Sequence, residues 1–353
     1  MELLTRIVES IRPLDGAAMR AARERQDDLT KPRGSLGRLE DLAVRLAGIT
    51  GRVRPYLEKP AVFVMAADHG VTHEGVSLYP QEVTAQMVAN FVRGGAGINV
   101  LARHVGARVV VVDVGVRGDT VPAANLVRKK VAAGSGNIAR GPAMTREQAV
   151  AAVEAGIEVV ETEASKGLDL AATGDMGIGN TTPSSAVCAV LTGEPVEAVT
   201  GRGTGLDDAG LARKCEVIRR ALAVNRPDPS DPLDVLAGVG GFEIGAIAGV
   251  ILACAAHRIP VVIDGFVSGA GALIAAGLAP LAREYMIAGH LSAEPGHAFV
   301  LKHLGLDPLL CLGMRLGEGT GACLGMFLVA AAAKLQAEMA TFSEAGVARA
   351  GVE

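Results

Sequence analysis

Short apolar runs that end in a polar residue or a glycine recur along this chain. The run at residues 61–67 reads AVFVMAA and is followed directly by Asp68, His69 and Gly70. Continuous apolar runs bounded by polar turns are typical of strands in a parallel sheet that is covered on both faces. Runs of this kind lie at residues 61–67, 109–114, 168–173, 261–263, 285–288 and 309–312. We expect them to form one mostly parallel sheet, with the polar residues gathered at its carboxyl edge.

Helical periodicity fills the segments between these runs. Residues 145–167 begin with Thr145 and Gln148 in the order of a capping box, and apolar residues follow at helical spacing. Residues 207–225 open with two acidic residues and carry two arginines late, as the helix dipole favours. Helices are also expected over residues 81–104, over residues 319–340 and over the charged first 50 residues, with a break at residues 31–40. Alternating strands and helices predict an α/β protein whose mostly parallel sheet is flanked by helices.

The chain contains no segment that we interpret as a membrane span or an export signal. Residues 265–282 are apolar and uncharged, but they contain four glycines, a serine and a proline, so we expect a buried helix pair there. The N-terminus carries charges throughout and lacks an apolar signal core. Five cysteines without a CxxC pair predict buried thiols in a reducing compartment. We therefore expect a cytoplasmic protein.

Composition narrows the class of partner. Of the 353 residues, 50% are hydrophobic and 20% are charged, which excludes an intrinsically disordered chain. The formal net charge of −4 disfavours a nucleic-acid partner, and the 3% of aromatic residues leaves few rings on which bases could stack. The 45 glycines allow backbone to approach a small ligand closely.

Two glycine-rich turns are candidates for binding an anion. GDMGIGNTT, at residues 174–182, lies between a predicted strand and a predicted helix, where backbone N–H groups and threonine hydroxyls can cradle a phosphate. It lacks the lysine of a P-loop, and a turn that merely needs glycine remains the alternative. GRGTGLDD, at residues 201–208, opens the helix that carries Lys214. Lys214 either reaches a phosphate or is a solvated helix residue.

Glu318 is the strongest candidate for a general base. It stands in MRLGEGTGA between Gly317 and Gly319, which clear space around its carboxylate. Burial would raise its pKa and make it a better base near neutral pH. A surface loop acid is the alternative.

Other polar motifs give weaker signals. His69 and His73 have the spacing of helical zinc ligands, but Gly70 indicates a loop and no third ligand pattern follows, so we expect no metal site. Ser292 precedes a helical stretch, where it fits an N-cap or a phosphate ligand. VVIDG at residues 261–265 supplies only Asp264, whereas a type I phosphoribosyl-diphosphate signature needs paired acids.

Eight segments in a fixed order carry a family resemblance. They are KPRGSLGRLEDLA, ADHGV, YPQEVTAQM, GDMGIGNTTPSSA, VGGFEIGAIAG, VVIDGFVSGA, GHLSAEPGH and MRLGEGTGA. Together they resemble the nicotinate-nucleotide–dimethylbenzimidazole phosphoribosyltransferases of cobalamin lower-ligand synthesis, over roughly residues 31–334. The resemblance implies a homodimer with a large Rossmann-like catalytic domain (residues 36–302) and a small helical domain from both chain ends (residues 1–35 and 303–346). It also implies transfer of 5-phosphoribose from nicotinate mononucleotide to 5,6-dimethylbenzimidazole, without metal or cofactor.

The resemblance also implies roles for particular residues. Glu318 is implied as the general base, Asp175 as a second acid where the family often has Glu, and Lys214 as a phosphate ligand, with Gly296 as a further contributor. Substrate-binding positions are implied at Tyr79, Gln86, Met87, Gly177, Ile178, Gly179, Asn180, Thr181, Thr182, Gly203, Lys214, Asp264, Ser292, Met314 and Leu316. Two alternatives stay open: transfer to another base such as adenine, benzimidazole or a phenol, and a non-catalytic nucleotide-binding protein.

Overall fold

A parallel sheet of six strands forms the centre of the protein. The computed structural model describes residues 1–118, 120, 123 and 125–348. Within this part of the chain the strand order is β3-β2-β1-β4-β5-β6, and every neighbouring pair is parallel. The strands are β1 (Pro60–Ala67), β2 (Arg108–Gly115), β3 (Leu126–Arg128), β4 (Leu170–Met176), β5 (Val261–Ile263) and β6 (Met286–Ala288). The predicted α/β class with a mostly parallel sheet is confirmed.

Helices fill the connections and the two chain ends. They are α1 (Glu2–Ser10), α2 (Gly16–Asp28), α3 (Arg38–Thr50), α4 (Val83–Arg93), α5 (Gly97–Val105), α6 (Arg146–Ala164), α7 (Thr181–Thr192), α8 (Val196–Val199), α9 (Asp208–Asn225), α10 (Pro232–Val239), α11 (Phe242–Ala256), α12 (Phe266–Leu278), α13 (Gly296–Leu304), α14 (Thr320–Glu338) and α15 (Phe342–Ala345), with the 3-10 helices η1 (Gly70–Glu74) and η2 (Pro280–Tyr285). The capping box of Thr145 and Gln148 is present at the start of α6. The helix expected over residues 81–104 is interrupted at Gly94, which ends α4 in a left-handed conformation.

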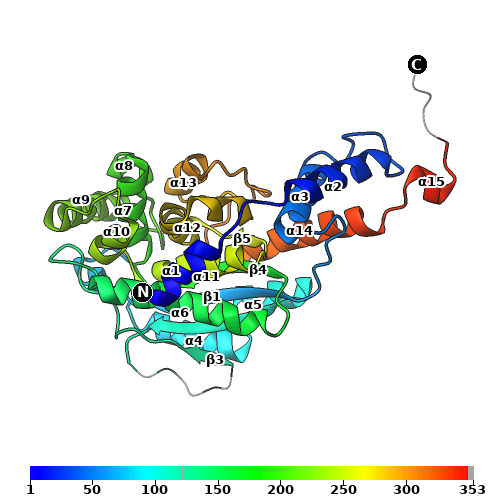
Figure 1. Ribbon diagram of the computed structural model, residues 1–353. Helices are drawn as coiled ribbons and strands as arrows, with labels where there is room; N and C mark the ends of the chain where they lie inside the picture. Colours follow the sequence, from blue (N-terminus) through cyan, green and yellow to red (C-terminus); the bar gives the residue numbers. More distant parts are fainter. Residues whose placement is uncertain (119, 121–122, 124, 349–353) are drawn as a thin grey trace.

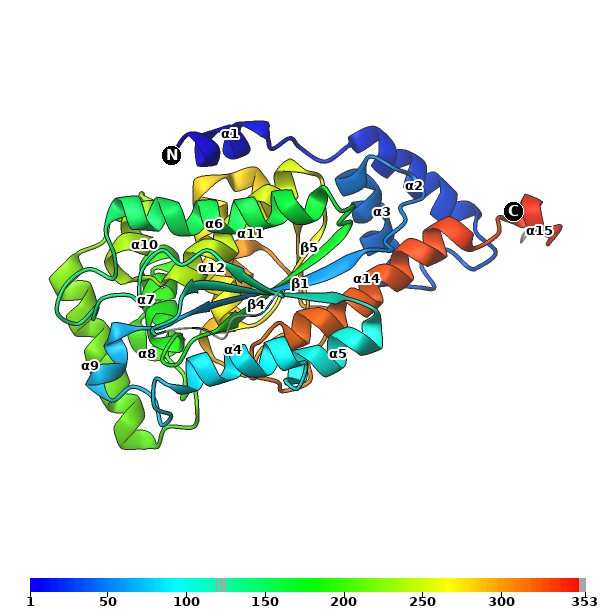
Figure 2. The same ribbon diagram turned by 90° about the horizontal axis from the view of Figure 1, so that it is seen from below.

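Helices cover both faces of the sheet, and alternate residues of each strand point to opposite faces. Along β1, Phe63 and Met65 join the core beneath α6 and α11, whereas Val62 and Val64 join the core beneath α5 and α14. Figure 2 shows α6 and α11 on one side of the sheet and α4 and α5 on the other. All strands are parallel, so their carboxyl ends meet at one edge of the sheet.

The structure corrects two predictions about secondary structure and adds one strand. Residues 309–312 form no strand: Leu310 makes an isolated bridge to His290, and Leu312 is exposed. β3 went unpredicted because it is three residues long and only its first residue, Leu126, is buried. The apolar segment after Gly265 forms one buried helix, α12, followed by the 3-10 helix η2, instead of a helix pair.

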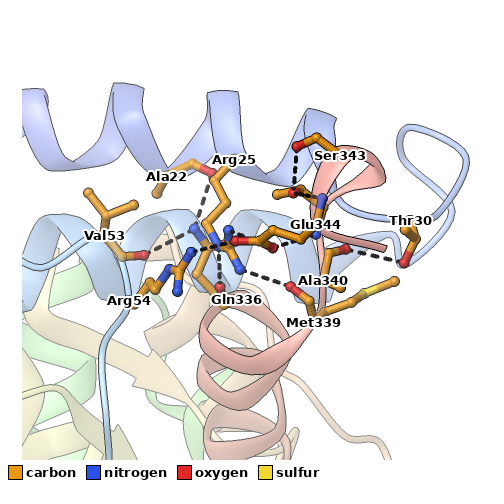
Figure 3. A network of polar contacts seen from close by, with 11 residues as sticks. Ala22, Arg25, Thr30, Val53, Arg54, Gln336, Met339, Ala340, Ser343 and Glu344 are labelled. Carbon is orange, nitrogen blue, oxygen red and sulfur yellow. Dashed lines mark hydrogen bonds and ion pairs between the residues drawn. The ribbon is translucent and has the colours of Figure 1, made fainter. Parts of the chain in front are cut away.

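Helix α14 connects the sheet to the helices of the chain ends, as Figure 1 shows. It packs on α3 and α5 and also contacts α2. At its carboxyl end, Arg25 of α2 donates from Nε to the carbonyl of Gln336 and from Nη2 to that of Met339, both at 2.8 Å (Figure 3). The amide of Gln336 in turn donates to the carbonyls of Ala22 and Val53. α2 and α14 are thus held together by buried polar contacts.

The packing of the chain ends bears on the predicted domain boundaries. α3 was assigned to the large domain by the boundary at residue 36, yet it packs with α2 and α14. α1 was assigned to the small domain, yet it packs against α6 and α11. The division into two domains remains a prediction.

All five cysteines are free; four are buried, but Cys311 is exposed, so the prediction of buried thiols is wrong for that residue. Among the described residues, α14 is the one helix whose length and composition would allow it to cross a membrane, and 61% of its apolar window is buried within the protein. A buried core helix has the same length and composition, so this is weak evidence for a span.

Candidate active site

A cavity of about 550 Å³ lies at the carboxyl edge of the sheet. Its walls come from the ends of β4, β5 and β6, from the start of α4, and from the segments at residues 76–79, 203–204 and 315–318. Ligands of parallel α/β sheets bind at this edge, and cavities of this size suit a small molecule. The predicted glycine-rich turn and Glu318 both line it.

Glu318 lies in the cavity wall on an unusual stretch of backbone. Its φ is +62°, and the φ angles of Gly317 and Gly319 are +79° and +89°, so three successive residues are left-handed. The side chain is 6% exposed, and its Oε2 accepts a hydrogen bond from the N–H of Ile98 at 3.1 Å, in the first turn of α5. Burial raises the pKa of Glu318, and the negative charge of Asp264 raises it further. The alternative of a surface loop acid is excluded.

Asp175, at the end of β4, connects the Glu318 loop to the glycine-rich turn. Its Oδ2 accepts a hydrogen bond from Nδ2 of Asn180 at 2.8 Å. Its carboxylate also lies beside Gly317, where a Cβ would come within 3.2 Å of both oxygens. Burial, reinforced by the charge of Asp264, raises the pKa of Asp175 to about 8. Asp175 is therefore protonated over much of the neutral range.

The glycine-rich turn forms one wall of the cavity and leads into α7. Residues 177–181, which are Gly177, Ile178, Gly179, Asn180 and Thr181, all line the cavity. The turn is fixed from behind by Thr84, whose hydroxyl accepts the N–H of Ile178 at 3.1 Å. Backbone N–H groups at a helix start are suited to bind an anion. Thr182 was predicted to contact substrate, but it is buried away from the cavity because it belongs to the first turn of α7.

Lys214 is completely buried, so the alternative of a solvated helix residue is wrong. Its Nζ donates to Oγ1 of Thr181 at 2.7 Å and to the carbonyl of Gly201 at 3.0 Å. Desolvation lowers the pKa of Lys214 to about 8, while the carboxylate of Glu294 opposes that shift. Lys214 does not line the cavity; its ammonium lies directly behind Thr181 and Gly203, which do.

The apolar end of the cavity contains part of the predicted base pocket. Tyr79, Met87 and Leu316 line it, together with Val83 and Met176. Gln86 and Met314, which were also predicted there, do not line it. Gln86 lies on the exposed side of α4, and Met314 precedes the lining segment at residues 315–318. A shift of one position along a helix, or of two along a loop, decides whether a residue lines the cavity. The order of motifs along the chain does not determine positions that finely.

Of three further predicted contacts, Asp264 and Gly296 lie outside the cavity lining and Ser292 belongs to it. Asp264 is buried beneath the cavity, where its carboxylate accepts the N–H groups of Gly319 at 3.2 Å and Ala322 at 2.8 Å. Ser292 lines the cavity, but it is not the N-cap of α13, since that helix begins at Gly296. Gly296 itself packs against the ring of Phe266 and lies outside the cavity lining.

Sequence reasoning missed three ionisable residues of the cavity, together with the hydroxyls of Ser77 and Thr204. Arg315 donates from Nη1 to the carbonyl of Gly203 at 2.8 Å, and Glu294 accepts the N–H of Gly203 at 3.0 Å. His290 follows β6 and also lines the cavity. All three belong to motifs quoted above. Because these motifs lie at the carboxyl edge of the sheet, their polar residues could have been predicted to line the cavity.

His69 and His73 do not line the cavity. His69 is buried behind Gly177, with its Nε2 2.9 Å from Oε1 of Glu243, and His73 belongs to η1. Within the described ranges, no group of three or more His, Cys, Asp or Glu side chains is arranged to hold a metal ion.

Comparison with known proteins shows the family of this chain. A family model described as "Phosphoribosyltransferase" matches residues 11–347. The chain belongs to this phosphoribosyltransferase family. It is 77% identical, over 99% of both chains, to the nicotinate-nucleotide–dimethylbenzimidazole phosphoribosyltransferase of Desulforudis audaxviator, and 63% identical, over 98% of both, to that of Chloroflexus aggregans. The crystal structure of CobT from Thermus thermophilus superposes with a TM-score of 0.92 at 52% identity, covering 95% of this chain and 100% of that one.

Proposed function

We propose that this phosphoribosyltransferase moves 5-phosphoribose from nicotinate mononucleotide to 5,6-dimethylbenzimidazole. The products are α-ribazole 5′-phosphate and nicotinate, and the reaction serves the lower ligand of cobalamin. The names of the relatives support both substrates. The observation that carries the proposal is Glu318, a buried carboxylate with a raised pKa at the apolar end of a cavity whose other end is a phosphate cradle.

The chemistry requires one proton transfer, and Glu318 is suited to it. One ring nitrogen of the benzimidazole attacks C1′ with its lone pair. The bond from C1′ to nicotinate breaks, its electron pair returns to the pyridine nitrogen, and that ring leaves without needing a general acid. The proton on the second benzimidazole nitrogen passes to Glu318, whose raised pKa makes it an effective acceptor near neutral pH.

The remaining site residues position the nucleotide. The 5′-phosphate binds the turn at residues 177–181 and Gly203, while Lys214 supplies positive charge from behind Thr181. Anchoring the phosphate holds C1′ between the incoming base and the leaving ring, so binding energy remote from C1′ serves orientation. Asp175 is held beside Gly317 and Asn180, where it supports both walls. Tyr79, Met87 and Leu316 cover the incoming base.

Assembly and location are part of the proposal. We propose a homodimer in the cytoplasm, with the two-domain division described above. The exposed apolar side chains Val100 on α5 and Phe327 on α14 support a surface that a second copy covers. Five free cysteines are compatible with a reducing compartment. Light scattering on the purified protein tests the dimer directly.

Product analysis tests the function. Purified protein is incubated with nicotinate mononucleotide and, in parallel, with 5,6-dimethylbenzimidazole, benzimidazole, adenine or a phenol, and products are identified by chromatography and mass spectrometry. We expect α-ribazole 5′-phosphate and an equimolar amount of nicotinate with the first base. The apolar lining by Tyr79, Met87 and Leu316 favours the dimethylated base over adenine, which carries an extra polar amine. Binding of the nucleotide without any product would support a non-catalytic nucleotide-binding protein.

A further inference from the structure

His290 lies in a slot that the fold keeps open for its ring. The residue follows β6, is 2% exposed and lines the cavity. Its ring lies against the first turn of α14 at Gly321, where a Cβ would come within 2.1 Å of Cδ2 and 2.4 Å of Nε2. Any side chain at position 321 would therefore displace the ring.

The polar atoms of this ring lack full partners within the protein. Nδ1 is buried without a hydrogen bond among the described residues. Nε2 is 3.6 Å from Oδ1 of Asp264, which exceeds hydrogen-bond length. The two oxygens of Asp264 already accept N–H groups of Gly319 and Ala322. A buried histidine left in this state has unused capacity to bind a ligand.

Open space adjoins Nε2 on the side of Gly265. A Cβ on Gly265 would lie 3.5 Å from Nε2 of His290 and 3.7 Å from Oγ of Ser292, so the space is flanked by both atoms. All three residues line the cavity. A ligand oxygen placed there can accept the N–H of His290 and bond with the hydroxyl of Ser292.

The surrounding charges favour a neutral hydroxyl over a phosphate at this position. Oδ1 of the buried Asp264 lies 3.6 Å from Nε2 of His290. This carboxylate would repel a phosphate dianion, whereas a hydroxyl feels no such repulsion. The positive groups, Lys214 and Arg315, lie instead around Gly203.

The location of His290 indicates which part of the nucleotide it would contact, namely the sugar next to C1′. Through Asp264 and Gly321, His290 is tied to the loop and helix that carry Glu318; through Ser292 and Glu294, its strand end reaches the phosphate cradle at Gly203. Between a catalytic carboxylate and a phosphate lies the ribose. We propose that His290 and Ser292 bind the 2′-hydroxyl of the ribose and set the preference for ribonucleotides over 2′-deoxyribonucleotides. This inference rests on the proposed function.

A substrate–variant cycle tests the proposal. kcat/KM is measured with nicotinate mononucleotide and with its 2′-deoxy analogue for the parent, His290→Leu, His290→Gln and Ser292→Ala. We expect His290→Leu to lose about 10-fold with the ribonucleotide, the effect of one hydrogen bond, and less than about 2-fold with the deoxy analogue. His290→Gln keeps an N–H donor and should retain part of the preference, and Ser292→Ala should weaken it. Equal losses with both substrates, or no loss, would overturn the assignment.

Binding measurements separate this inference from the proposed function. Titration calorimetry with ribose 5-phosphate and 2-deoxyribose 5-phosphate needs no turnover. We expect the parent to bind the ribose compound more tightly and His290→Leu to bind both alike, while His303→Gln, an exposed control, behaves as the parent. If the protein shows this pattern but forms no product with any base, the hydroxyl site stands and the proposed function fails. If the parent does not discriminate between the sugars, the hydroxyl site fails. If His290→Leu does not fold, His290→Gln and Ser292→Ala carry the comparison.

Discussion

Glu318→Gln is the substitution that tests the chemistry most directly. The amide has the size of the carboxylate, and its oxygen can still accept the N–H of Ile98, so the loop keeps its anchor. Removal of one negative charge relieves repulsion with Asp264, which raises the pKa of Glu318 in the parent. We therefore expect a melting temperature equal to or above that of the parent, while the proton acceptor is lost.

The expected loss of turnover follows from the role of a general base. Such a group contributes about 10²–10⁴ in rate, which is about 2.7–5.4 kcal/mol of the activation barrier. Because only the chemical step depends on the proton transfer, kcat should fall by this amount and KM for nicotinate mononucleotide should change little. The parent should lose activity as the pH falls through the raised pKa of Glu318, since the protonated acid cannot act as a base. Glu318→Gln should not show this acid limb.

The assay is chromatographic measurement of nicotinate release at saturating base over a range of pH. Glu338→Gln, an exposed residue at the far end of α14, is the matched control and should behave as the parent. Glu318→Asp keeps the charge but shortens the reach, so it should recover only part of the activity. Turnover of Glu318→Gln within a few-fold of the parent, in folded protein, would refute the assignment of the base.

Three other predictions concern the supporting groups. Lys214→Met removes a charged donor from Thr181 and Gly201, so it should raise KM for nicotinate mononucleotide about 10-fold more than KM for the base. Arg213→Met, at the exposed neighbouring residue, should leave both KM values unchanged. Equal effects of Lys214→Met on the two KM values would contradict the phosphate role. Asp175 holds a proton in the folded state up to about pH 8, whereas the unfolded chain releases it near pH 4, so stability should fall as pH rises through this window. In Asp175→Asn, the melting temperature should depend less on pH between about pH 5.5 and 8 than in the parent. Exhaustive EDTA treatment should leave turnover unchanged, because nicotinate leaves without a Lewis acid; activity lost on chelation and restored by one divalent ion would show that a metal is needed.

The sequence predicts the elements that are buried on both faces and the turns that follow them. β1, β2 and β4 are continuous apolar runs because each is covered by helices on two sides, and such burial leaves a clear pattern. Residues 309–312 have the same apolar pattern but are not buried. β3 is a strand of the sheet but lacks a continuous apolar run. An apolar run signals that residues prefer to be covered. Which strand neighbours cover them depends on contacts between distant segments.

The same distinction applies to the site. Local motifs correctly bring the glycine-rich turn and Glu318 to one cavity, because both follow from chain order and the parallel sheet. Whether a residue faces the cavity or supports it from behind depends on fine placement. Lys214 and Asp264 are buried behind the cavity lining, where they bond backbone groups of Gly201 and Ala322. Arg315, absent from the predictions, lines the cavity and donates to the carbonyl of Gly203. The spacing of motifs along the chain does not tell which polar residues line the cavity and which lie behind its lining.

The glycine before Asp175 illustrates how a motif can serve a neighbour. Gly174 was grouped with the phosphate turn, but a Cβ there would lie 2.5 Å from the carbonyl oxygen of Glu318. A left-handed non-glycine residue costs roughly 1–2 kcal/mol, so Glu318 keeps its conformation only if its surroundings hold it. Gly174 lets the loop lie directly on β4, and Asp264 fixes the following turn through Gly319 and Ala322. The strain at Glu318 is thus sustained by two neighbouring strand ends. Replacing Gly174 by alanine should displace the carboxylate that we propose as the base before it disturbs the proposed phosphate site.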